Sequence, residues 1–110
     1  MTEELTLDQY QNRAARTGNT AVVHGERFLN YTLGLCGEAG EVAEVVKKWY
    51  YHSTDFEMPE DKLRAELGDV LWYVSQIAAS AGMSLNQVAQ ANLDKLTERY
   101  PKGFEHGKSI

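Results

Sequence analysis

One stretch decides the architecture of this 110-residue chain: Leu35-Cys36-Gly37-Glu38-Ala39-Gly40-Glu41-Val42-Ala43-Glu44-Val45-Val46. It has the composition of an apolar helix that is interrupted by two acids, Glu38 and Glu41, three residues apart. Residues at this spacing share one face of a helix. Because each residue turns about 100° around the axis, Glu38 falls inside the apolar stripe of Val42 and Val45, and Glu41 falls at its edge.

A second stretch repeats this organisation: Ala65-Glu66-Leu67-Gly68-Asp69-Val70-Leu71-Trp72. Glu66 lies within the apolar arc of Val70 and Tyr73, and Asp69 lies at the edge of that arc. An unpaired buried carboxylate is costly in free energy unless its pKa shifts until it is neutral. We therefore expect the two helices to be neighbours whose four carboxylates surround a bound cation.

The chemistry of these ligands favours a hard ion, with Mg²⁺ as first choice and Mn²⁺ as second. A di-iron bundle typically carries Glu-x-x-His on two helices, whereas the position of the histidine is occupied here by Glu41 in one pair and by Asp69 in the other. Zinc is disfavoured because the three histidines fall in predicted loops or the tail without ligand spacing. These histidines are His24, His52 and His106.

Composition indicates a single domain over residues 1–110, with 43% hydrophobic residues and a net charge of −5. This charge argues against binding of a nucleic-acid polymer, although a divalent metal could still bring a nucleotide to the protein. The lone Cys36 is predicted to be a small buried side chain in a reducing compartment. No membrane span or signal-peptide pattern is recognised, so we expect a cytoplasmic protein.

Apolar periodicity predicts four helices and no strands, which favours an all-α bundle of four to five helices. Two capping boxes are expected, one from Thr6 to Gln9 and one from Ser84 to Gln87, and Gly82 should end the third helix. Residues 103–110 are predicted to be flexible or to lie over a neighbouring chain. The expected helices run from Leu7 to about Thr17, from near Glu26 to about Tyr51, from Pro59 at the first helical position to Ala81, and from Ser84 to near Tyr100.

Three glycines, Gly34, Gly37 and Gly40, lie inside the predicted second helix. Glycine is unfavourable in a helix interior by up to about 1 kcal/mol relative to alanine. Small residues beside the acids would allow a phosphate or another helix to approach the backbone. The sequence does not separate these two explanations.

Cations that could hold phosphate lie near the end of the chain. Asn92, Lys95 and Arg99 share one face of the predicted fourth helix, and Lys102 follows it. Without the acidic pairs, a solvated helix end would be the better explanation of the two cations, and the acidic pairs make phosphate binding the favoured one. Lys48 is a weaker candidate for the same role, and Trp72 could stack on a base or belong to the core.

The two acidic pairs, with about two dozen residues between them, resemble the metal-binding signature of the MazG-like nucleoside triphosphate pyrophosphohydrolases. Their neighbouring residues and the segment from Asn92 to Pro101 are also similar to that family, and the resemblance extends from about Asn30 to Phe104. It implies a helical bundle that assembles as a dimer or tetramer with its site near a subunit interface.

The resemblance also implies an activity: hydrolysis of a nucleoside triphosphate between the α and β phosphates, giving a monophosphate and pyrophosphate. Glu38, Glu41, Glu66 and Asp69 would hold magnesium, and Glu38 or Glu41 would orient or deprotonate the attacking water. Lys95 and Arg99, with Lys102, would hold the phosphates.

Three other interpretations stay open at this point. The same scaffold could act on a narrower substrate, such as dUTP, dCTP or phosphoribosyl-ATP. The chain could instead be a non-catalytic helical interaction module with exposed, metal-free acids. The acids could also pair with lysine or arginine across an oligomer interface and have a purely structural role.

Overall fold

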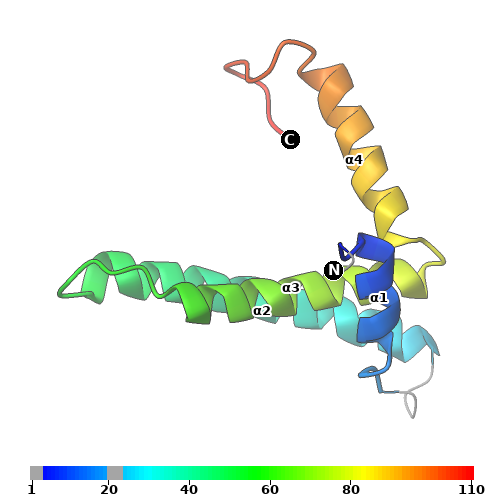
Figure 1. Cartoon of the computed structure of the whole chain (residues 1–110), viewed down its shortest axis with the longest axis horizontal. Helices are drawn as coiled ribbons and strands as arrows, with labels where there is room; N and C mark the ends of the chain where they lie inside the picture. Colours follow the sequence, from blue (N-terminus) through cyan, green and yellow to red (C-terminus); the bar gives the residue numbers. More distant parts are fainter. Residues whose placement is uncertain (1–3, 20–23) are drawn as a thin grey trace.

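The computed structural model describes residues 4–19 and 24–110, which form four α-helices and no strand (Figure 1). The predicted all-α class is therefore confirmed. The helices are α1 (Leu7–Ala15), α2 (His24–His52), α3 (Glu60–Ser80) and α4 (Leu85–Arg99).

The two longest helices, α2 and α3, pack along each other as an antiparallel hairpin (Figure 1). The shorter helices gather at the end of the hairpin where α2 begins and α3 ends. Here α4 packs on α1 and α3 and then projects away from the hairpin (Figure 1). As a result, one end of the hairpin is covered by other helices, whereas the connection at its far end is not.

Local hydrogen bonds account for the helix boundaries. Both predicted capping boxes are present, and Gly82, with φ of 76°, follows α3 in the left-handed conformation that glycine tolerates. The first helix stops at Ala15, earlier than predicted, because the N–H and the hydroxyl of Thr17 both donate to the Ala14 carbonyl and close a tight turn.

Two predictions about residues outside the helices need correction. Pro59 is the N-cap of α3 and not its first helical residue, so α3 begins one residue later than expected. His24 and His52 are the terminal residues of α2 and not loop residues, because α2 extends further in both directions than the apolar periodicity indicated. His106 lies in the tail after α4, as predicted.

A buried glutamine fixes the junction of three helices. The side-chain amide of Gln11 donates to the carbonyls of Ser75 and Met83, at 3.0 Å each, and its oxygen accepts from the N–H of Leu85 at 3.1 Å. These bonds connect α1 to the end of α3 and to the start of α4. They therefore determine the position from which α4 leaves the hairpin.

The apolar core is small for a chain of this length. The radius of gyration of the chain is 16.9 Å, whereas a compact domain of this size has a radius of gyration of about 13 Å. The chain has a solvent-accessible surface of 8522 Å², roughly 2,400 Å² more than a typical folded monomer of its mass. Among the described side chains, the buried apolar ones are Tyr31, Val45, Ala78 and Leu85.

The outer face of α2 is one place where apolar surface is uncovered. Leu29 and Leu33 are 59% and 62% exposed, and Cys36, one turn further on, is exposed as well. The prediction that Cys36 is buried is therefore wrong. It assumed that the whole apolar surface of α2 is covered, whereas α3 covers only one side of this helix.

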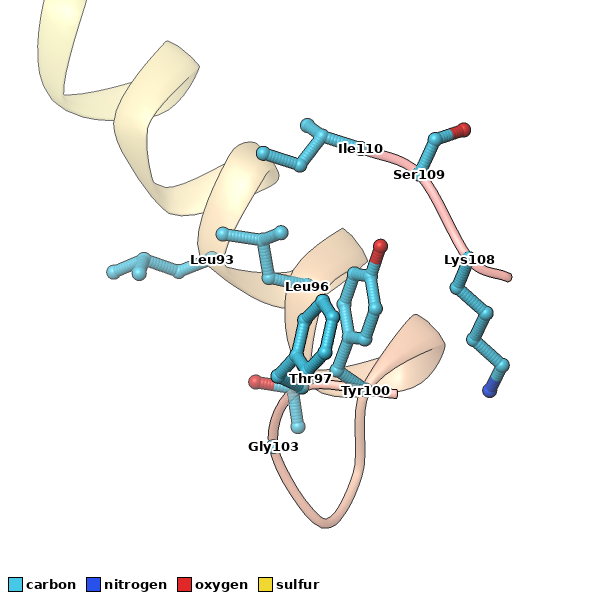
Figure 2. Close-up of a pocket in the computed structure, with 9 residues that line it drawn as sticks. Leu93, Leu96, Thr97, Tyr100, Gly103, Lys108, Ser109 and Ile110 are labelled. Atoms are coloured by element: carbon cyan, nitrogen blue, oxygen red, sulfur yellow. The ribbon is translucent and has the colours of Figure 1, made fainter. Parts of the chain in front are cut away.

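The tail forms a second uncovered apolar surface. Residues 102–110 turn back along α4, and Lys108 donates to the Arg99 carbonyl at 2.8 Å. Between the helix and the tail lies an open groove of about 640 Å³, lined mainly by Leu93, Leu96, Tyr100 and Ile110 (Figure 2). No helix in the part of the chain that the structure describes is long and apolar enough to cross a membrane.

The close approach of α2 and α3 gives a first prediction. A Cβ atom on Gly34 would overlap the ring of Tyr73, whereas a Cβ on Gly68 would meet nothing within 4 Å. Displacing the ring costs about 1–3 kcal/mol, which exceeds the gain of up to about 1 kcal/mol from the better helix former. We expect Gly34→Ala to lower the free energy of unfolding in denaturant titrations.

Gly68→Ala is the matched control, because it changes helix propensity without a new contact. This variant should be as stable as the wild-type protein or more so. Equal stabilisation by both substitutions would contradict the packing of Tyr73 on Gly34.

Candidate metal centre

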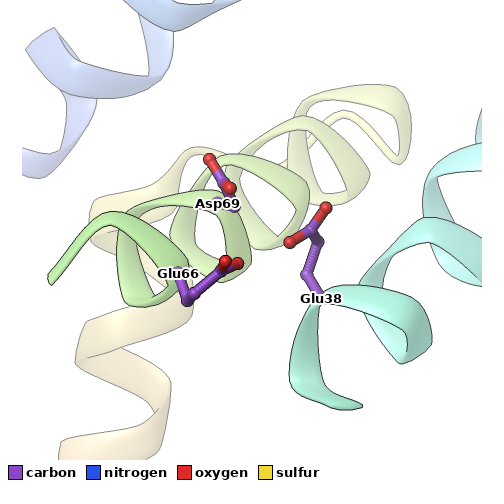
Figure 3. Close-up of side chains that lie close together, drawn as sticks. All are labelled: Glu38, Glu66 and Asp69. Atoms are coloured by element: carbon purple, nitrogen blue, oxygen red, sulfur yellow. The ribbon is translucent and has the colours of Figure 1, made fainter. Parts of the chain in front are cut away.

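Three carboxylates meet between α2 and α3. Glu38 lies midway along α2, and Glu66 and Asp69 lie one turn apart on α3. One oxygen of each carboxylate lies within 4.8 Å of an oxygen of the other two (Figure 3). Glu38 and Glu66 are half-buried and Asp69 is exposed, so the helical positions predicted for these three acids agree with the structure.

Within residues 4–19 and 24–110, the three carboxylates of the cluster form no ion pair with a Lys, Arg or His side chain. Partial burial, followed by the charges of Asp69 and Glu66, raises the pKa of the Glu38 carboxyl. The ion pairs among the described residues are Lys48–Glu44, Arg64–Asp61 and Lys108–Glu105, and none of them includes a member of the cluster. Three converging carboxylate oxygens without a cation are a donor set that fits a hard divalent metal ion.

Glu41 does not belong to the group of three. It lies one turn after Glu38 on α2 and is exposed, and its charge also contributes to the raised pKa of Glu38. Of the four acids predicted to surround a cation, the structure therefore brings three together and leaves Glu41 beside them. Its role as a metal ligand stays a prediction.

An aromatic pocket of about 340 Å³ adjoins the acids. It is lined by the acids Glu38 and Asp69 and by Thr17, Trp72 and Tyr73. The indole N–H of Trp72 donates to the hydroxyl of Thr17 at 2.9 Å. Trp72, a predicted substrate contact, is therefore adjacent to the clustered acids and close to α1.

The predicted phosphate ligands lie elsewhere in the chain. Lys48 pairs with Glu44 at 3.5 Å and lines a separate hollow with Trp49, His52 and Lys62 near the far end of the hairpin. Four other candidates are exposed on α4 and the turn after it, which project away from α2 and α3 (Figure 1). The four are Asn92, Lys95, Arg99 and Lys102, and within one chain they do not line the acidic pocket.

Two residues at the site were not identified by the sequence patterns. Thr17 follows α1 in a segment without a recognisable motif, and only its hydrogen bond to Trp72 assigns it to the pocket. Tyr10 of α1 lies near the acids, since burial and then the charge of Asp69 raise the pKa of its hydroxyl. No local signal could have identified either residue, because both reach the site through tertiary packing.

Comparison with known proteins agrees with this arrangement. The model of the MazG nucleotide pyrophosphohydrolase domain matches residues 26–104. The "Gene 37 protein" of Mycobacterium phage L5 is 39% identical over 109 residues, which cover 92% of this chain and 94% of that relative. No solved structure matches the chain significantly.

The matched region contains all three acids of the cluster and most of the described helical structure. It leaves out α1 and Thr17, so the family match covers the acidic side of the pocket but not its Thr17 edge. On the strength of both comparisons, this chain belongs to the MazG nucleotide pyrophosphohydrolase family.

Proposed function

We propose that this protein is a magnesium-dependent nucleoside triphosphate pyrophosphohydrolase. It cleaves the bond between the α and β phosphates and releases a nucleoside monophosphate and pyrophosphate. The observation that carries this proposal is the convergence of Glu38, Glu66 and Asp69 in a chain of the MazG family. Mn²⁺ is the alternative ion, because it accepts the same oxygen ligands.

In this proposal Glu38, Glu66 and Asp69 hold the cation, which when bound offsets the phosphate charge and lowers the pKa of a bound water. The negative charge of the protein makes a bound cation necessary for binding a triphosphate. With a net charge of −5 and three clustered acids, the protein would otherwise repel a triphosphate. The half-buried positions of Glu38 and Glu66 keep their oxygens directed at one point.

Glu41 is the acid available for the attacking water. It is exposed, lies one turn from Glu38 and is outside the group of three carboxylates. A carboxylate that is not occupied with the cation can orient a water molecule and accept its proton as the oxygen attacks phosphorus. We therefore assign the general-base role to Glu41.

The phosphate contacts require a second copy of the chain. Asn92, Lys95 and Arg99 lie on one face of α4, and the apolar groove lies on another face of the same helix. Because α4 projects away from its own acids, its cations reach an acidic pocket only when two chains assemble (Figure 1). We therefore infer a homodimer or homotetramer in which α4 of one chain contributes Lys95 and Arg99 to another chain's substrate.

The exposed apolar surface supports such an assembly. A typical protein interface buries about 800 Å² on each partner, and the chain exposes roughly 2,400 Å² more than a compact monomer. Leu29 and Leu33 on α2 and the groove between α4 and the tail are apolar surfaces that a second copy would cover (Figure 2).

Product analysis tests the activity. We expect the purified protein with Mg²⁺ to convert nucleoside triphosphates to monophosphate and pyrophosphate, and to form no diphosphate. Glu66→Gln should lower turnover by about 100-fold or more, because it removes a charged ligand that stabilises the transition state. Release of orthophosphate, or unchanged turnover in the variant, would contradict the proposed reaction. A non-catalytic module would give no product at all.

Thermal unfolding tests the metal site. The folded protein binds the Glu38 proton more tightly than the unfolded chain, because the folded-state pKa is raised. Without metal, the fold should therefore lose stability as the pH rises from the ordinary value of 4.5 through the raised pKa. Glu38→Gln should abolish this loss and melt above the wild-type protein at neutral pH in a chelator.

With Mg²⁺ the order of the two melting temperatures, wild type and Glu38→Gln, should be reversed. The wild-type melting temperature should rise, whereas that of Glu38→Gln should stay nearly constant, since its affinity for the ion falls by more than about tenfold. Glu41→Gln is the matched variant that separates the two roles: its melting temperature should still rise with Mg²⁺ although its turnover is lost. If Mg²⁺ changed the melting temperatures of Glu38→Gln and Glu41→Gln equally, the assignment of Glu38 as metal ligand and Glu41 as base would be contradicted.

Light scattering tests the assembly. The wild-type protein should have the mass of a dimer or tetramer, and Leu33→Glu should shift this mass toward the monomer by placing a charge on the outer face of α2. Thr54→Glu adds the same charge in the connection between α2 and α3 and should leave the mass unchanged. A monomeric wild-type protein would contradict the inference.

A further inference from the structure

The pocket beside the acids has the size and lining for the nucleoside part of a substrate. Its volume of about 340 Å³ is within the range of small-molecule sites. Two of its lining residues are Glu38 and Asp69, which in the proposed function hold the metal and thereby the phosphates. The others are Trp72, Tyr73 and Thr17, so the base would lie beside aromatic side chains and close to the Thr17 hydroxyl.

The aromatic wall is held in place from several sides. The Trp72 ring makes edge-to-face contacts with Tyr31 and Tyr73, at centroid distances of 5.1 Å and 5.0 Å, and its N–H is bonded to Thr17. Tyr73 in turn lies against the backbone of Gly34. A fixed aromatic face stacks on every base with little discrimination, so any selection must come from hydrogen bonds at the edge of the pocket.

The hydrogen bonds at this edge are fully determined. The Ala14 carbonyl can only accept, so the hydroxyl of Thr17, at 2.7 Å, donates its single proton to it. The Trp72 indole N–H can only donate, so Thr17 accepts this bond. One lone pair of the Thr17 oxygen stays available, whereas the Thr17 proton and the Trp72 N–H are already used. A ligand that contacts the Thr17 hydroxyl therefore meets an acceptor.

We propose that Thr17 determines the base preference of the site and selects bases that present an amino group over their keto counterparts. This inference rests on the proposed function, because it assumes that the acids hold a metal–triphosphate. Cytosine has an N–H₂ donor where uracil has a carbonyl, and adenine has one where hypoxanthine has a carbonyl. The favoured substrates are therefore cytosine and adenine nucleotides.

The expected preference is about tenfold. An amino group would gain a hydrogen bond to Thr17, whereas a keto group placed there would leave two acceptors facing each other. Thr17→Val has nearly the same shape but lacks the hydroxyl, so it removes the acceptor and releases the Trp72 N–H. The edge of the pocket then offers a donor, and the preference should shift toward the keto base.

The test is calorimetric binding of the α,β-methylene analogues of CTP and UTP with Mg²⁺, which measures affinity without turnover. The wild-type protein should bind the CTP analogue about tenfold more tightly than the UTP analogue. Thr17→Ser should keep this ratio, and Thr17→Val should abolish or reverse it. Trp72→Phe provides a second test, because it keeps the hydroxyl of Thr17 and should therefore retain the CTP preference.

Two results would overturn the assignment in distinguishable ways. Equal binding of the two analogues by the wild-type protein, or an unchanged ratio in Thr17→Val, would overturn the role of Thr17 and leave the pyrophosphohydrolase proposal intact. Binding of neither analogue would overturn both, since no nucleotide would then occupy the site. If Trp72→Phe no longer preferred the CTP analogue to the UTP analogue, the indole and not Thr17 would select the base, and the inference would also be overturned.

Discussion

Repulsion among three carboxylates is the constraint on which the rest of this structure depends. The antiparallel packing of α2 and α3 brings Glu38 level with Glu66 and Asp69, and partial burial together with the charges of these two acids raises the pKa of Glu38. A chain selected for stability alone would have apolar side chains at the two half-buried positions. A bound cation would offset the charge of these acids, and the chain belongs to a family of nucleotide pyrophosphohydrolases.

The large exposed surface of the chain follows from the same hairpin. Two long helices can cover only one side of each other, and α1 and α4 cover one end, so leucines remain exposed along α2 and on α4. The hydrogen bonds of Gln11 determine where α4 leaves the hairpin and hence keep its cations away from the acids of the same chain. In the proposed enzyme, assembly would both cover the apolar surface and complete the site.

Much of this could be predicted from the sequence, because helix periodicity, capping boxes and the placement of Glu38 and of Glu66 within an apolar stripe are local properties. What could not be predicted depends on tertiary contacts. The direction of α4 depends on Gln11, which lies more than 60 residues from its partners in sequence. Thr17 reaches Trp72 across 55 residues, and Cys36 is exposed because α3 covers only one side of α2.

In the proposed enzyme, the acids of the hairpin jointly hold one kind of divalent metal ion. The most direct measurement of this is anomalous X-ray scattering from crystals grown with Mn²⁺ in place of Mg²⁺. A strong anomalous peak is expected between the carboxylates of Glu38, Glu66 and Asp69. Crystals that contain Mn²⁺ but show no peak there, with the three side chains directed apart into solvent, would contradict it.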